Sequence, residues 1–214
     1  MKKIITILSA SFLLAFSALA ETGMIGIKYG TGELDGTQNS YDDKRSGAGT
    51  IAARSASEDH EYGAIFAELN VPAVDGLSVG LEVIPFTAIL TIDSSTTDSS
   101  LELSDYTTLY GLYSYDFGGA APYIKVGYSK GDISNVKAAF AGTSVTSASN
   151  SLEGMMVGVG VQKELVSTVT GRLEATYTDF DSVSVTTENA AGNSVTKTGD
   201  AELTTFSVSI AKSF

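Results

Sequence analysis

The sequence contains no cysteine, no tryptophan, one histidine and only three prolines in 214 residues. Without cysteine, a disulfide framework and a thiolate metal site are excluded, and a single histidine excludes a multi-histidine metal cluster. Basic residues are also scarce, because 13 lysines and arginines face 25 aspartates and glutamates, for a formal net charge of −12. An acidic chain lacks the basic surface that phosphate backbones require, so no nucleic acid partner is expected. No cofactor is predicted either.

The first residues differ from the rest of the chain. Residues 1–20 begin with two lysines after the initial methionine, continue through an apolar middle and end in Ala-Leu-Ala. This order is typical of a secretory signal peptide with a small-residue cleavage site. We therefore expect a signal peptide over residues 1–20 and one folded domain over residues 21–214. After the signal peptide, no apolar run approaches the ~18 residues that a membrane-spanning helix needs.

Alternation of apolar with small or polar residues dominates the remainder, and no long segment repeats every 3.6 residues. In residues 155–162, for example, methionine and valine at the odd positions alternate with methionine, glycine and glutamine at the even positions. Such alternation is the pattern of a strand with two different faces. It predicts eight strands, over residues 22–31, 62–71, 77–90, 105–116, 122–130, 152–163, 170–181 and 201–214.

The connections between these strands alternate between short and long. The second, fourth and sixth connections contain five or six residues with turn-forming sequences such as PAVDG, whereas the others contain 14 to 30 residues. In an up-and-down sheet every second connection lies at the same end, so one end has tight turns and the other has long loops. Transmembrane β-barrels combine this asymmetry with an even number of strands. The sequence thus predicts an all-β fold, an eight-stranded antiparallel up-and-down transmembrane β-barrel.

In a membrane, the apolar face of each strand must point outward, toward lipid. Backbone groups cannot stay unpaired in hydrocarbon, so the sheet must close on itself with its apolar residues outward. The opposite face then fills a lumen that is only wide enough for side chains. Three basic and three acidic residues share the inward face, and ions enclosed there persist only when they are paired. The expected lumen charge network comprises Lys28, Glu68, Glu82, Lys125, Arg172 and Glu174.

Outward aromatic residues fall at two levels of the predicted barrel. A ring of this kind is apolar, while a tyrosine hydroxyl favours water, so aromatic residues gather at the two membrane boundaries. We predict two aromatic girdles, formed by Tyr29, Tyr128 and Tyr177 toward the long loops and by Tyr115, Phe117 and Phe214 toward the short turns.

Two strands are ambiguous. Pro85 cannot donate a ladder hydrogen bond, so it implies either a bulge or an early end to the third strand. We favour a bulge that turns Phe86 outward. The facing of the fourth strand is also open, since Tyr110 and Leu112 enter the lumen if Leu109 and Tyr113 face lipid.

The end of the chain carries a further pattern. Phe206, Val208 and Ile210 alternate with small residues, and Phe214 is the last residue. With the signal peptide, the eight strands and the alternating loop lengths, this pattern resembles the small eight-stranded outer-membrane β-barrels of Gram-negative bacteria. That family includes the OmpA membrane domain, OmpX and the opacity-type surface antigens. Lys212 departs from the family pattern, which has an apolar residue there.

The resemblance implies a location in the bacterial outer membrane, reached by export and cleavage of the signal peptide. It also implies outer-membrane lipid as the surroundings, a monomeric state, and recognition of the terminal Phe206, Val208, Ile210 and Phe214 as an assembly signal by the barrel assembly machinery. The expected function is a non-enzymatic, structural and adhesin-like surface role, with an occluded, salt-bridged lumen and an unknown extracellular partner at the long loops.

Three other functions stay open. One is a narrow ion-conducting pore. Another is a barrel enzyme that modifies lipid, for which His60 is the only available base; an exposed loop histidine is the simpler interpretation. A third is a soluble periplasmic barrel like the lipocalins, which would reverse the orientation and enclose the apolar residues. No metal site is predicted, because the acidic residues Asp35, Asp42, Asp43 and Asp59 match no calcium-loop spacing.

Overall fold

The structure is a computed structural model that describes residues 23–43, 49–85, 88–92, 99–138 and 143–214. Residues 1–20, where the signal peptide is predicted, lie outside these ranges. Within them, no helix is long and apolar enough to cross a membrane. The described residues form twelve strands. These are β1 (Gly23–Gln38), β2 (Tyr41–Asp43), β3 (Gly49–Ile51), β4 (Arg54–Asn70), β5 (Leu77–Ile84), β6 (Ala88–Ile92), β7 (Ser99–Ser114), β8 (Ala121–Ala138), β9 (Thr143–Ala148), β10 (Ser151–Val166), β11 (Val169–Asn189) and β12 (Ser194–Ser213).

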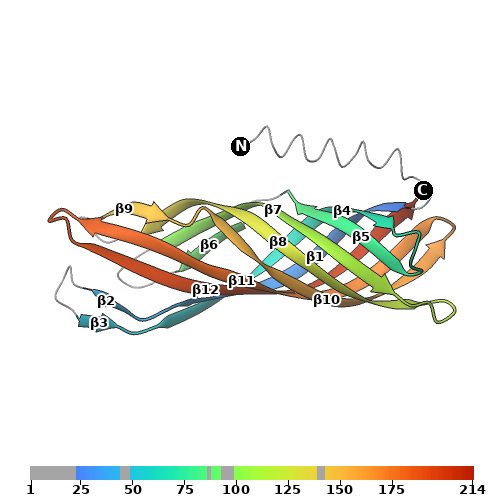
Figure 1. Cartoon of the computed structure of the whole chain (residues 1–214), viewed down its shortest axis with the longest axis horizontal. Helices are drawn as coiled ribbons and strands as arrows, with labels where there is room; N and C mark the ends of the chain where they lie inside the picture. The colour runs from blue at the N-terminus through green and yellow to red at the C-terminus, as the bar shows by residue number, and fades with distance from the viewer. Residues whose placement is uncertain (1–22, 44–48, 86–87, 93–98, 139–142) are drawn as a thin grey trace.

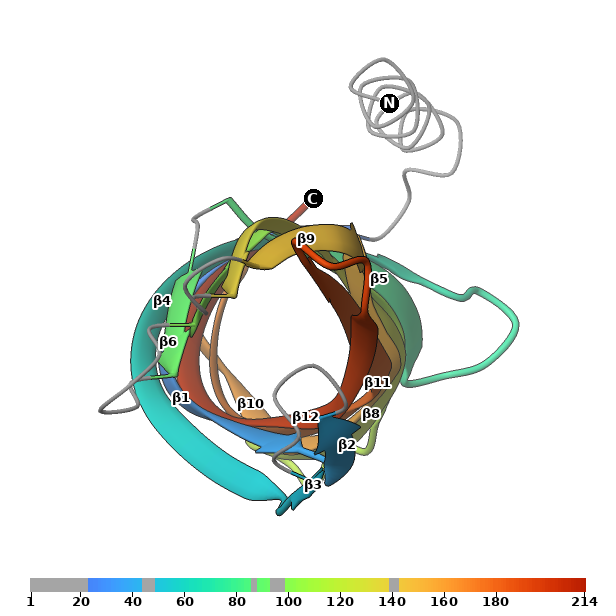
Figure 2. The same cartoon turned by 90° about the vertical axis from the view of Figure 1, so that its left-hand side faces the viewer.

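Eight of these strands close into a ring, as the view along the barrel shows (Figure 2). The order around the ring is β1, β4, β5, β7, β8, β10, β11 and β12, and β12 pairs with β1 to complete it. Every pairing in the ring is antiparallel. The predicted eight-stranded up-and-down barrel is therefore confirmed.

The four other strands lie outside this ring order. β6 pairs with β7 beyond the end of β5, and β9 pairs with the far part of β11. β2 and β3 form a separate small hairpin. All four lie in the half of the elongated barrel that is away from the C-terminus (Figure 1).

The two ends of the barrel differ as the loop lengths predict. Short connections at residues 71–76, 115–120 and 167–168 lie at the end that also carries the C-terminus (Figure 1). At this short-turn end the backbone N–H of Phe214 donates to the carbonyl oxygen of Gly23 at 3.0 Å. This bond joins the last strand to the first and so contributes to closing the ring.

The strands extend further toward the other end than the alternation predicts. β1 continues to Gln38 and β4 begins at Arg54, so much of the expected first loop is paired strand. β11 and β12 form a hairpin that reaches Glu188 opposite Ser194. The barrel therefore continues as a paired sheet, here called the extension, well beyond the strand ends predicted from sequence.

The third predicted strand is interrupted at its proline. β5 ends at Ile84, directly before Pro85, and β6 begins at Ala88. Pairing with β7 also shifts by one residue, from Ile84 opposite Tyr106 to Ala88 opposite Leu103. The continuous strand 77–90 is thus wrong, because proline offers no N–H to the ladder. Phe86, which we expected to face outward, lies outside the described residues.

Side chains alternate between the two faces of the barrel wall, and exposure shows which face is which. Val157 and Val159 of β10 are 51% and 60% exposed, whereas Met156 between them is 4% exposed. In β7, Tyr110 and Leu112 are buried, which settles the open question in favour of the lumen. The apolar residues lie outside, so the reversed orientation of a lipocalin-like barrel is wrong.

Candidate functional site: an ion-paired lumen

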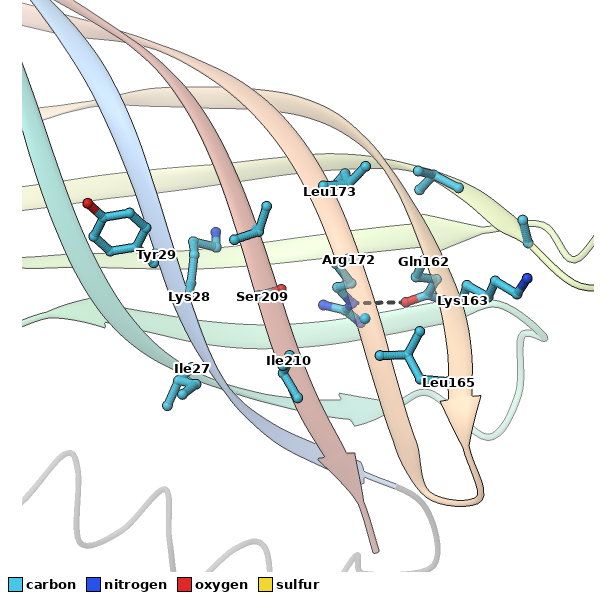
Figure 3. Close-up of a pocket in the computed structure, with 14 residues that line it drawn as sticks. Ile27, Lys28, Tyr29, Gln162, Lys163, Leu165, Arg172, Leu173, Ser209 and Ile210 are labelled. Atoms are coloured by element: carbon cyan, nitrogen blue, oxygen red, sulfur yellow. Dashed lines mark hydrogen bonds between the residues drawn. The ribbon is translucent and has the colours of Figure 1, made fainter.

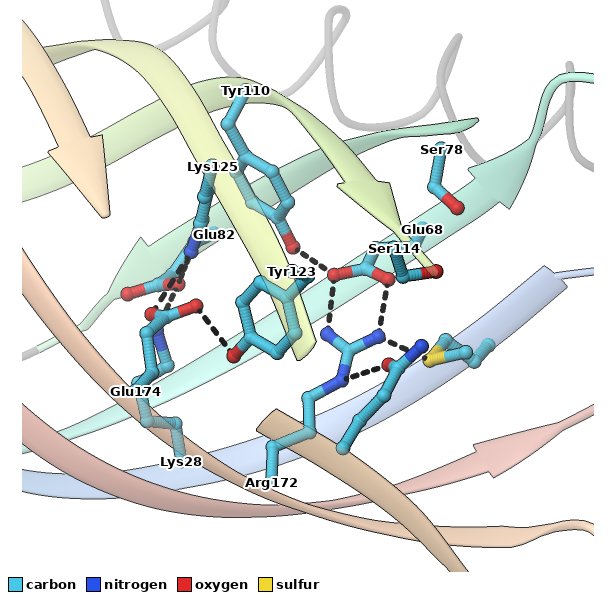
Figure 4. A network of polar contacts seen from close by, with 12 residues as sticks. Lys28, Glu68, Ser78, Glu82, Tyr110, Ser114, Tyr123, Lys125, Arg172 and Glu174 are labelled. Carbon is cyan, nitrogen blue, oxygen red and sulfur yellow. Dashed lines mark hydrogen bonds and ion pairs between the residues drawn. The ribbon is translucent and has the colours of Figure 1, made fainter. Parts of the chain in front are cut away.

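Six charged residues of five strands meet inside the barrel. The strand period of two turns them inward while their apolar neighbours turn outward. Each is between 1% and 8% exposed, and together they are Lys28, Glu68, Glu82, Lys125, Arg172 and Glu174. These are the residues that the alternation assigns to the lumen, and the structure sorts them into two ion-paired groups (Figure 4).

The first group is a fork-to-fork pair between Arg172 of β11 and Glu68 of β4. Arg172 Nη1 lies 2.6 Å from Glu68 Oε1, and Arg172 Nη2 lies 2.7 Å from Glu68 Oε2. Such bidentate pairs fix geometry as well as charge. Arg172 Nε also donates to Gln162 Oε1 at 3.0 Å, so the guanidinium is held from both sides.

The second group is a quartet of two lysines and two glutamates from four strands. Lys28 Nζ lies 2.5 Å from both Glu82 Oε2 and Glu174 Oε1. Lys125 Nζ contacts the same two oxygens, at 3.0 Å and 3.2 Å. Each charge therefore faces two of the opposite sign, and this alternation reduces the cost of placing four ions away from bulk water. We call these four residues the lumen quartet.

Two tyrosines link the groups (Figure 4). The Tyr110 hydroxyl donates to Glu68 Oε1 at 2.7 Å, and Lys125 Nζ lies 3.9 Å from the centroid of the Tyr110 ring. The Tyr123 hydroxyl donates to Glu174 Oε2 at 3.0 Å. Neither tyrosine was predicted as part of the network. Their inward position was the only available sequence signal, and for Tyr110 that position was ambiguous.

Glycines on the lumen face make room for these rings. A Cβ built on Gly80 would lie 2.5 Å from Cζ of Tyr110, and one built on Gly160 would lie 2.3 Å from Cζ of Tyr123. In both cases the glycine is the direct cross-strand partner of the tyrosine. The missing side chain lets the ring lie across the neighbouring strand, where its hydroxyl reaches a carboxylate. The glycines of the inward face are thus part of the site.

The extension contains a second lumen layer, which is apolar. Tyr106 and Phe180 pack edge to face with centroids 6.2 Å apart. Thr108 of β7 and Ser129 of β8 are cross-strand partners, and their hydroxyl oxygens lie 2.8 Å apart. Of this layer, Leu34 and Ile133 lie beyond the strand ends predicted from the sequence, whereas its other members lie within predicted strands. Its buried members are Leu34, Tyr106, Ile133, Leu152 and Phe180.

The outer surface carries the predicted girdle residues. All six are between 39% and 74% exposed, namely Tyr29, Tyr128, Tyr177, Tyr115, Phe117 and Phe214. The Tyr128 hydroxyl donates to Glu153 Oε2 at 2.7 Å, and Tyr29 and Tyr177 are hydrogen-bonded to Glu61 and Glu202. A polar hydroxyl end beside an apolar ring suits a water–lipid boundary.

The terminal residues expected to form the assembly signal also face outward. Phe206, Val208 and Ile210 are 62%, 52% and 55% exposed, and Phe214 is 52% exposed. Lys212 continues the same outward series. Their placement is a matter of strand parity; a role in assembly stays a prediction.

His60 lies in β4 rather than in a loop, which corrects the expectation of an exposed loop residue. Its Nε2 is 3.9 Å from Glu58 Oε2, and the neighbouring Ser55 hydroxyl contacts Thr37 Oγ1 at 3.1 Å. Within the part of the chain that the structure describes, His60 Nε2 has no hydrogen-bond partner. Likewise, the described residues hold no group of three or more His, Cys, Asp or Glu side chains able to bind a metal.

Comparison with known proteins identifies the fold through solved structures. No protein-family model and no curated protein sequence matches the chain. Among solved structures, the outer membrane protein OprG from Pseudomonas aeruginosa has a TM-score of 0.66 at 15% identity, over 90% of this chain and 96% of OprG. The fold is that of a small outer-membrane β-barrel.

Two further barrels of this kind support the assignment. The outer membrane protein AlkL gives a TM-score of 0.57 at 15% identity, with 90% of each chain covered. Neisserial surface protein A gives 0.53 at 13% identity, over 89% of this chain and 97% of that protein. The likeness extends over nearly the whole barrel, which agrees with the architecture predicted from strand alternation.

Proposed function

We propose that the chain is a non-enzymatic integral protein of the bacterial outer membrane that keeps its lumen closed and presents its extension outside the cell as an interaction surface. The observation that carries this proposal is the sorting of side chains across one closed wall. The lumen side holds the paired ions, whereas the outer side exposes isoleucine, valine and leucine. An exposed belt of this kind suits acyl chains and would be unfavourable in water.

The ion pairs support a closed lumen. Two groups of ion pairs cross the barrel interior, and both have cationic and anionic members from strands on different parts of the ring. Tyr110, Leu112, Tyr123 and Met156 pack as a buried cluster in the same lumen. A solute would have to separate opposite charges in a narrow, low-dielectric space, which is costly. A narrow ion pore is the alternative, since ion pairs can exchange partners.

The extension supports the surface role. Its strands exceed the length that ~25 Å of apolar belt requires of tilted strands. β11 alone has 21 residues and β12 has 20. The hairpin between them presents paired backbone and polar side chains far from the short-turn end. An extended partner segment can add to such a sheet edge by backbone hydrogen bonding.

Epitope insertion tests both location and orientation. An epitope placed after Ala191, in the turn between β11 and β12, is expected to bind antibody on intact cells. The matched control carries the same epitope after Gly118, in the short turn between β7 and β8, and is expected to bind only after the outer membrane is permeabilised. Labelling of the second variant alone on intact cells would reverse the proposed orientation, and labelling of neither in the membrane fraction would contradict the location.

Planar bilayer recordings test closure. The wild-type barrel is expected to show no steady conductance in salt solution. A stable conductance of the unmodified protein would instead support the pore.

A further inference from the structure

A groove crosses the lipid-facing surface of β1, β12, β11 and β10 near the short-turn end (Figure 3). Its volume is about 620 Å³, within the ~300–1,000 Å³ of ordinary ligand sites. Two rows of outward side chains form its walls. The lower row begins with the cross-strand pair Ile27–Ile210 of β1 and β12, and the upper row begins with the pair Tyr29–Val208 of the same strands.

Gly171 opens the groove in the middle of the lower row. It is paired with Ile210 on one side and Lys163 on the other, so a row of large side chains is interrupted by a residue with none. Leu165 lies over the gap, because a Cβ on Gly171 would be 3.0 Å from its Cδ1. On the upper row, Leu173 continues the wall and is 57% exposed. The groove is therefore apolar along its length.

A positive charge stands at one end of this groove. Lys163 lines the groove and faces outward three residues before β10 ends. Lys212 lies just outside the lining, as the next outward residue of β12 after Ile210. Neither forms an ion pair within the described ranges. In a chain of net charge −12, two uncompensated lysines beside an apolar groove are complementary to one kind of molecule, an amphiphile with an anionic head and apolar chains.

We propose that this groove binds an anionic phospholipid, with an acyl chain between the two rows and the phosphate at Lys163 and Lys212. This inference rests on the proposed function, since the short-turn end then meets the periplasmic leaflet. The lysine heads lie at the boundary with water, while their stems follow the apolar wall. An acyl chain across the tilted strands lies beside Leu165, which packs over Gly171.

The absence of tryptophan from the sequence allows a direct test. Leu173→Trp places a single fluorescent reporter in the groove wall, and Leu109→Trp places one on the lipid-facing surface of β7, away from the groove. Each protein is reconstituted into phosphatidylcholine bilayers that contain a minor fraction of brominated phosphatidylglycerol or of brominated phosphatidylcholine. Bromine quenches tryptophan on contact.

At position 173 the brominated phosphatidylglycerol is expected to quench about threefold more effectively than brominated phosphatidylcholine, in line with two nearby lysines. At position 109 the two lipids are expected to quench equally. Lys163→Gln with Lys212→Gln, and separately Gly171→Leu, should abolish the preference at position 173. Lys197→Gln removes one charge at the opposite end of the barrel and should preserve it.

Equal quenching by both lipids at position 173 would overturn the site. So would an equal preference at both positions, which would indicate general enrichment, or a preference that survives loss of both lysines. Quenching by neither lipid at either position would show that the barrel is not in the bilayer, and would contradict the proposed function together with the site.

Discussion

Arg172 and Glu68 meet across the lumen through two parallel hydrogen bonds of 2.6 Å and 2.7 Å, although 104 positions separate them in the chain. Neither belongs to a strand adjacent to the other's in the ring, since β11 and β4 are separated by β12 and β1. The pair therefore exists only when the barrel has closed. The two buried ions are therefore paired only when the ring has closed with its strands in the correct order.

Loss of one partner of this pair should destabilise the barrel strongly. Glu68→Gln leaves the Arg172 guanidinium without its counter-charge, at an expected cost of about 3–5 kcal/mol in the free energy of unfolding. The double variant Glu68→Gln with Arg172→Gln should lose much less than the sum of the two single losses. Urea titration in detergent micelles, followed by the heat-modifiable shift on gels, measures each value.

A surface pair provides the control for this cycle. Lys130 and Glu153 also form an ion pair, but their side chains are 54% and 30% exposed. Exposed pairs contribute little, so the same cycle on these residues should give a much smaller coupling. Equal coupling in the two pairs would contradict the central role of the lumen pair.

Single substitutions in the lumen quartet should open the barrel to ions of a defined sign. Glu82→Gln leaves an excess of positive charge inside, and Lys125→Gln leaves an excess of negative charge. Because charges lining a pore attract counter-ions, the first variant should favour anions and the second cations. Reversal potentials across a salt gradient in planar bilayers give the sign, and the same selectivity in both variants would be inconsistent with the quartet as the barrier.

Gly80 should tolerate substitution poorly for a specific reason. The Cβ of alanine would lie 2.5 Å from Cζ of Tyr110, so the ring must move and its hydrogen bond to Glu68 must break. We expect Gly80→Ala to cost about 1–3 kcal/mol of stability. Gly111→Ala is the matched control, because its Cβ would meet no atom within 4 Å, and its stability should be close to that of the wild type.

A charged residue on the outer surface, at the level of the bilayer centre, should destabilise the inserted barrel. Val159 is 60% exposed, and Val159→Arg should destabilise the inserted barrel by about 2–4 kcal/mol in lipid vesicles. Val159→Leu keeps the surface apolar and should have little effect. Equal stability of the two variants would mean that this face does not contact acyl chains.

Strand parity accounts for most of what could be predicted. From the sequence alone it places Lys28, Lys125 and Arg172 inside and the valines of β10 outside. Alternate residues of a strand face opposite sides of the wall, so each residue can face only the lumen or the lipid. The eight strands and their two unlike ends follow from the same alternation and from the loop lengths. These features depend on local sequence alone.

Partner choice could not be predicted in this way. Parity does not show that Arg172 pairs with Glu68 whereas Glu82 and Glu174 share two lysines, since stagger between distant strands decides which side chains meet. The part of the extension built from the expected first loop was also missed, as residues such as Leu34 alternate with too few apolar neighbours to mark a strand. At Pro85 a known backbone rule allowed a bulge or an early strand end, and the structure has features of both: β5 ends at Ile84, and pairing with β7 resumes at Ala88 one residue out of register.

The orientation of the wall is the claim on which the rest depends, and a chain without cysteine allows it to be measured residue by residue. Single cysteines at positions 155 to 159 of β10 would carry a nitroxide label in lipid bilayers, and collision with oxygen or with a water-soluble nickel chelate would be recorded for each. We predict strong collision with oxygen, and little with nickel, at 155, 157 and 159, and weak collision with both at 156 and 158. The opposite alternation, with lipid contact at the even positions, would contradict the account.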